Sequence, residues 1–161
     1  MIISLNRVIV KSNLDTAFCP DFFLELSKQS RAMHEDSYLE NRLEYLWRKY
    51  FSDVPKEHPV EIHFGRESKY RFGSIRYGYG TKTVQITING RFRNKKYPSK
   101  IIDHTIAHEL VHYAQGFPTP GPRLHRYPHR GGVIDKELAK RDLTHLVSFY
   151  RSWVKNYINH F

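Results

Sequence analysis

The sequence predicts an α+β fold in which a small antiparallel sheet packs against one central helix and further helices flank the two. Helical patterns precede and follow a group of strand-like runs, and one helical pattern carries a broad apolar surface. With 161 residues and 40% hydrophobic content, the chain is long enough for one core and short for two. We therefore expect residues 1–161 to form one domain.

The N-terminal part is expected to be mainly helical. Residues 2–10 suit either a short strand or an extended arm, and apolar residues between positions 20 and 33 suggest a first helix. A second helix is clearer, because Ser37 and Glu40 have the spacing of a capping box. Its apolar stripe comprises Leu39, Leu43, Leu46, Trp47 and Tyr50. The loop at residues 52–59 ends this helical part.

Three strand-like runs follow, at residues 60–64, 70–79 and 83–89. The third run alternates apolar and polar residues, as expected for a strand with one buried face. Turn-forming residues from Gly78 to Thr81 join the second run to the third and favour a hairpin. Together these runs predict the antiparallel sheet.

The central helix is expected at residues 100–116, where the pattern H-E-x-x-H occurs. Positions i and i+4 of a helix lie on one face, so His108 and His112 can bind one metal ion while Glu109 lies close by. Two neutral imidazoles and a carboxylate that takes a proton from water are the groups that a zinc hydrolase needs. The pattern therefore predicts a hydrolytic zinc site on this helix.

The ends of the later helices also have sequence signals. Ser99 is expected to cap the central helix, and Gly116 to end it. Apolar residues at helical spacing over positions 135–159 predict one long last helix that packs on the central helix, with Asp135 as its cap.

A catalytic zinc site commonly has three protein ligands, so a third ligand is expected beyond the central helix. The candidates are His125, His129 and Glu137, and the sequence leaves all three open. His129 is favoured because it lies just before the last helix, a rigid element that can hold it. We expect His129 to complete a site for about one Zn²⁺ per chain.

The net charge of +10 is concentrated in one part of the chain. Residues 68–134 contain 12 Lys and Arg residues and only two acidic residues, whereas the remainder contains 14 of each sign. Such segregated positive charge favours an anionic partner, nucleic acid first. Aromatic residues accompany four of the cations, namely Arg91, Arg93, Lys95 and Lys96. This combination suits DNA, and single-stranded DNA above all.

The chain has one cysteine, Cys19, so it can form neither an internal disulfide nor a cysteine-based zinc finger. A single cysteine fits a reducing compartment. The sequence contains no signal-peptide pattern and no run of roughly 20 apolar residues. We therefore expect a cytoplasmic protein with no membrane segment, associated with DNA if the basic residues bind it.

Several stretches of the chain resemble the SprT-like zinc metallopeptidases, the family to which Spartan belongs. They are Tyr70–Gly73, Val84–Asn89, Ile101–His112 and a later histidine that precedes a helix. The resemblance covers residues 37–145, approximately. It implies a zincin-like minimal metallopeptidase domain, zinc bound by the two helical histidines and a downstream histidine, and Glu109 as the catalytic acid and base.

The expected function is hydrolysis of peptide bonds in a protein or peptide substrate. The resemblance suggests DNA-bound or DNA-crosslinked proteins as substrates. A C-terminal four-cysteine zinc ribbon is absent, so any contact with DNA must come from the basic surface itself. Two alternatives remain open: a zinc-stabilised nucleic-acid-binding protein with little or no peptidase activity, and a general intracellular peptidase.

Overall fold

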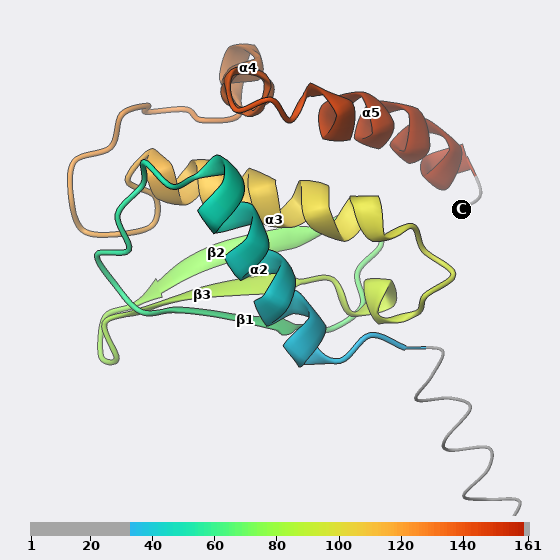
Figure 1. Cartoon of the computed structure of the whole chain (residues 1–161), viewed down its shortest axis with the longest axis horizontal. Helices are drawn as coiled ribbons and strands as arrows, with labels where there is room; N and C mark the ends of the chain where they lie inside the picture. The colour runs from blue at the N-terminus through green and yellow to red at the C-terminus, as the bar shows by residue number, and fades with distance from the viewer. Residues whose placement is uncertain (1–32, 160–161) are drawn as a thin grey trace, which may run out of the picture.

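Helix α3 (Ser99–Ala114) forms the middle layer of the fold, between a three-stranded sheet and the C-terminal helices (Figure 1). The computed structural model describes residues 33–159. Helix α2 (Asp36–Tyr50) crosses α3 and also packs on the first strand. Buried apolar side chains from all these elements form one core, and the predicted α+β class is confirmed.

The sheet consists of β1 (Val60–Phe64), β2 (Gly73–Gly78) and β3 (Thr83–Ile88), in the order β1-β3-β2. Strands β2 and β3 pair antiparallel, as the hairpin signal predicts. The expectation of a wholly antiparallel sheet is wrong, because β1 pairs with β3 in parallel. The turn residues determine only the hairpin. The connection at residues 65–72 takes the chain to the far edge of the sheet, so β1 and β3 run in the same direction.

Helix α2 confirms the predicted second helix, and its buried residues are Leu39, Leu43, Leu46 and Trp47. The predicted capping box at Ser37 is wrong, because the helix begins at Asp36 and its N-cap, Glu35, makes no side-chain cap hydrogen bond. The Asp36 carboxylate instead accepts a hydrogen bond from the backbone N–H of Phe64 at 3.0 Å and pairs with Arg93 at 3.2 Å. The start of α2 is thereby joined to β1 and to the loop after β3.

Helix α3 is close to its predicted extent. Gly116, with φ 77°, follows its end as predicted. Ser99 is not the cap, since Pro98 occupies the N-cap position and no side chain caps the helix there. The carboxylate of Asp103 accepts two hydrogen bonds from Arg42, at 2.8 and 3.0 Å, which hold α2 against α3.

The prediction of one long C-terminal helix is wrong, because the chain forms α4 (Val133–Lys140) and α5 (Thr144–Asn159). Asp142 lies between them with φ 60°, a left-handed conformation that interrupts a helix. Arg141 pairs with Asp53 at 2.6 Å, which fixes this turn against the loop after α2. The predicted cap Asp135 lies inside the first turn of α4, after the N-cap Gly132.

Some predictions concern residues outside the described part of the chain. These are the strand or arm at residues 2–10 and nearly all of the helix at residues 20–33. Within residues 33–159, no helix combines the length and the apolar character that crossing a membrane requires.

Asn89 holds the connection between β1 and β2 in place. Asn89 is only 4% exposed. Its side-chain amide group donates to the backbone carbonyls of Ser68 and Arg71 at 2.7 and 2.8 Å. Its carbonyl oxygen accepts from the backbone N–H groups of Ser68 and Arg91. One buried amide therefore satisfies four backbone groups in two loops.

We expect Asn89→Ala to lower the free energy of unfolding by about 2–4 kcal/mol, because it leaves four part-buried backbone groups without their side-chain partner. Urea denaturation measures this loss. Asn94→Ala is the matched control, since within residues 33–159 the side chain of Asn94 makes just one local hydrogen bond, accepted from the backbone N–H of Lys96. The control should stay within about 0.5 kcal/mol of wild type. Equal losses in the two variants would contradict the role given to Asn89.

Candidate metal centre

Three histidines from two parts of the chain meet at one end of α3. His108 and His112 are one turn apart on the helix, and His129 comes from the loop before α4. The ring centroid of His129 lies 5.4 Å from that of His108 and 4.7 Å from that of His112. One ligand atom from each of the three lies within 4.8 Å of the others, so the set can hold a metal ion.

The loop that carries His129 is tied back to the end of α3. The backbone N–H of Leu124 donates to the carbonyl of Gln115 at 3.1 Å, and that of Phe117 donates to the carbonyl of His112 at 2.8 Å. After His129 the chain turns through two left-handed glycines, Gly131 and Gly132, with φ 68° and 67°. Glycine adopts this conformation without steric cost, and the turn leads directly into α4.

The histidine set has the chemical state that metal binding requires. Burial is the largest cause that lowers the pKa of His108 to about 3 and that of His112 to about 4, with smaller contributions from neighbouring histidines. Both rings are therefore neutral at pH values near 7, and neutral imidazole is the form that binds metals. Nδ1 of His112 is buried without a hydrogen-bond partner among residues 33–159. These two neutral rings together with the adjacent imidazole of His129 fit a divalent cation such as zinc.

Glu109 lies beside the histidines and is 5% exposed. Burial raises the pKa of its carboxyl group to about 8. The opposite wall is Gly73, at the start of β2: a methyl group added there would lie 2.8 Å from Oε1 of Glu109 and 2.5 Å from Cγ2 of Thr105. Only a residue without a side chain lets β2 approach the carboxylate this closely.

A pocket of about 130 Å³ opens next to Glu109. Its walls come from α3, from α5 and from the chain that enters β2, and its lining residues include Tyr70, Phe72, His104 and Tyr150. The rings of His104 and Tyr150 stack with centroids 4.1 Å apart. A cavity of roughly 150 Å³ holds a benzene molecule, so this pocket has the size for one side chain of a bound polypeptide.

Of the three candidates for the third ligand, the structure brings His129 to the helical histidines. His125 is exposed in the loop and lies outside the set. Glu137 faces the other way, since its carboxylate pairs with Arg141 at 3.2 Å and with Lys140 at 3.7 Å.

The predicted DNA-binding cations lie on and after the 3-10 turn Gly90–Arg93. Arg91 pairs with Glu67 at 3.5 Å and donates to the hydroxyl of Tyr157 at 3.4 Å. Arg93 pairs with Asp36. Lys95 and Lys96 are exposed. Two of the four charges are thus partly neutralised by carboxylates of the same chain.

Sequence reasoning missed the roles of Gly73 and Tyr150. A glycine before a strand is a weak signal by itself, and nothing in a helical apolar pattern indicates that one ring faces a polar pocket. Comparison of the chain with protein-family models, with curated proteins and with solved structures found no match in any of the three.

The first prediction for the site concerns zinc affinity. We expect His129→Ala to weaken zinc binding by more than the roughly 10–100-fold that loss of an outer-shell partner costs, because it removes a ligand itself. Elemental analysis and competition with a chelator measure this loss. His125→Ala is the matched control and should bind zinc like wild type. Loss of zinc in the control alone would assign the third ligand to His125.

The second prediction concerns the stability of the metal-free protein. A carboxyl group whose pKa rises from 4.5 to about 8 on folding binds its proton more tightly in the folded state, so its contribution to stability is lost as pH rises between these values. Glu109→Gln does not titrate. From pH 4 to pH 7 the wild type should therefore lose about 3 kcal/mol of unfolding free energy that the variant does not lose, so the variant becomes more stable relative to wild type by that amount.

Chemical denaturation at several pH values, with chelator present, measures this difference. Glu40→Gln, at an exposed position of α2, is the control and should follow wild type across the range. A constant difference between Glu109→Gln and wild type would contradict the raised pKa.

Proposed function

We propose that this protein is a zinc-dependent metallopeptidase that hydrolyses peptide bonds. The observation that carries the proposal is the convergence of three histidines beside the buried carboxyl group of Glu109, which follows His108 on α3 and lines a pocket. Structural zinc sites have four protein ligands, whereas catalytic sites have three and leave one position open. A three-histidine set with an adjacent acid fits the catalytic kind.

His108, His112 and His129 would hold the zinc ion, which when bound supplies a Lewis acid and lowers the pKa of water. Glu109 would accept a proton from water at a carboxylate oxygen and return it to the leaving amine. A nearby cation favours the charged form of a carboxyl group and so opposes the effect of burial on Glu109. The buried position of Glu109 keeps it close to the reacting atoms.

Strand β2 supports the assignment of a polypeptide substrate. Among the strands of residues 33–159 it lies at an edge of the sheet and pairs only with β3, and it begins at Gly73 beside Glu109. An extended peptide can add to such an edge through backbone hydrogen bonds. One of its side chains would then enter the pocket formed with Phe72 and Tyr150.

The zincin-like fold and the SprT-like family are part of the same proposal. The order of a helix, a small sheet, a metal-binding helix, a ligand loop and closing helices supports them. The excess positive charge supports action on DNA-bound proteins. It also keeps a zinc-stabilised nucleic-acid-binding protein as the second candidate, and activity separates the two.

We expect Glu109→Gln to reduce cleavage of an unfolded protein substrate by roughly 10²–10⁴-fold while zinc content stays unchanged, because the variant keeps its shape and loses the proton acceptor. Cleavage is followed by gel electrophoresis or with a quenched fluorescent peptide. Glu40→Gln should retain wild-type activity. If the zinc-loaded wild type and Glu109→Gln cleave equally, or if neither cleaves, the peptidase proposal is wrong.

A further inference from the structure

The outer face of the sheet is polar, and no helix among residues 33–159 covers it (Figure 1). Strand registers place Ser74, Thr87 and His63 side by side across the three strands, and Arg76 beside Gln85. These side chains alternate with the apolar residues of the inner face, which pack towards α3. They line a groove of about 530 Å³, which we call the sheet-face groove.

Three arginines line the sheet-face groove: Arg66 and Arg71 from the connection between β1 and β2, and Arg76 from β2. All three side chains are exposed. Within the described part of the chain, none of the three guanidinium groups forms an ion pair or a hydrogen bond with the protein. The one acidic residue of the groove, Glu67, pairs with Arg91 outside it. The groove therefore has a clear excess of uncompensated positive charge.

The backbone that carries two of these arginines is fixed. The carbonyl of Arg71 accepts a hydrogen bond from the buried amide of Asn89, and the carbonyl of Arg66 accepts one from the backbone N–H of Gly90. Because the loop is already held in place without a ligand, binding loses less conformational entropy in ordering it. Hydroxyl groups of Ser74 and Thr87 add hydrogen-bonding partners between the charges.

We propose that the sheet-face groove binds the phosphate backbone of a single-stranded nucleic acid. Arginine forks match phosphate oxygens, and serine and threonine hydroxyls are common further phosphate contacts. The single-stranded form is favoured by Tyr70, which lines the pocket beside Glu109 rather than the groove but is 77% exposed and adjacent in sequence to Arg71. An exposed ring offers a stacking surface to an unpaired base, which a duplex does not present.

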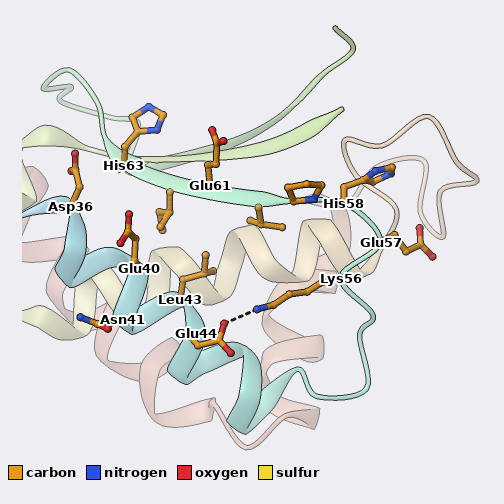
Figure 2. A pocket seen from close by; sticks show the side chains of 13 residues that line it. Asp36, Glu40, Asn41, Leu43, Glu44, Lys56, Glu57, His58, Glu61 and His63 are labelled. Atoms are coloured by element: carbon orange, nitrogen blue, oxygen red, sulfur yellow. Dashed lines mark hydrogen bonds and ion pairs between the residues drawn. The ribbon is translucent and has the colours of Figure 1, made fainter. Parts of the chain in front are cut away.

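A second groove, on the β1 side of the sheet, is acidic and limits the surface on which a nucleic acid can bind. Between α2 and β1 lies a groove of about 920 Å³ whose acidic side chains include Glu40, Glu57 and Glu61 (Figure 2). Its one ammonium group, Lys56, is paired with Glu44 at 2.6 Å. Like charges repel a phosphate backbone from this side. A bound strand is thereby confined to the β2 side of the sheet.

The β2 side is also the side of the candidate catalytic pocket. Phe72 and Gly73 line both the sheet-face groove and the pocket beside Glu109. A nucleic-acid strand held by Arg71 and Arg76 would lie against Phe72 and Gly73, which on their other side line the pocket proposed for the substrate. The inference goes beyond the proposed peptidase, because binding in the groove needs neither zinc nor cleavage.

The experiment measures fluorescence anisotropy of a labelled short oligothymidylate over a series of salt concentrations. For single strands the slope of log affinity against log salt changes by about 0.7 per phosphate contact. The triple variant Arg66→Ala, Arg71→Ala, Arg76→Ala should therefore have a slope shallower by about 2. Zinc content and the unfolding midpoint should stay at wild-type values, because the three side chains make no contacts that hold the fold.

The control removes three exposed cations from helices, in the variant Arg48→Ala, Lys136→Ala, Lys155→Ala. It loses the same charge and should keep most of the slope. Equal loss in both variants, or no salt-dependent binding by wild type, overturns the proposal. So does loss confined to a variant of Arg91, Arg93, Lys95 and Lys96, which assigns binding to the loop after β3. Binding to phosphatidylserine vesicles without binding to the oligonucleotide also overturns it. None of these outcomes depends on whether the protein cleaves peptides.

Discussion

Burial of α3 on almost every side is the constraint on which the rest of the structure depends. Of its 16 residues, 11 are buried, because the sheet, α2 and the C-terminal helices all pack against it. Four of the buried residues are polar: His104, Thr105, Glu109 and His112. The low pKa of the imidazoles and the high pKa of Glu109 follow from this burial. The packing that forms the core thus also prepares the candidate metal centre.

Burying polar side chains on α3 lowers the stability of the fold unless each of them finds a hydrogen-bond partner. Thr105 satisfies its hydroxyl group by donating to the carbonyl of Ile101 at 2.7 Å, so it needs no partner outside the helix. Among residues 33–159 the Glu109 carboxyl group has no such partner, and it stays buried behind Gly73. Nε2 of His104 and Nδ1 of His112 are buried without a hydrogen-bond partner among residues 33–159, and such groups in a native structure often have a catalytic or ligand-binding role. Here these buried polar groups lie on α3, where the sheet and the C-terminal helices pack against it.

Local sequence patterns predicted most helices and strands of the described part of the chain. Contacts between residues far apart in the sequence determined the pairing of β1, the break in the C-terminal helix and the approach of His129. Strand β1 and the helix that carries His108 and His112 follow from periodicity alone. The parallel pairing of β1 does not, because no residue in the connection specifies which edge the next strand takes. The break at Asp142 depends on the pairing of Arg141 with Asp53, which are 88 positions apart. His129 was predicted from its position before a helix, although its approach to the site depends on the loop's contacts with the end of α3.

Net charge illustrates the same difference between sequence and structure. Counting residues places the positive charge in one half of the chain, yet the fold neutralises part of it, through Asp36 with Arg93 and Glu67 with Arg91. Charges that stay unpaired determine the field that a partner meets, and those on Arg71 and Arg76 lie on the open face of the sheet. The acidic groove beside β1 lies at the opposite edge. The sheet therefore separates the two signs of charge, with the positive side next to the pocket at Glu109. A charged polymer bound there would bring any protein attached to it within reach of the same pocket.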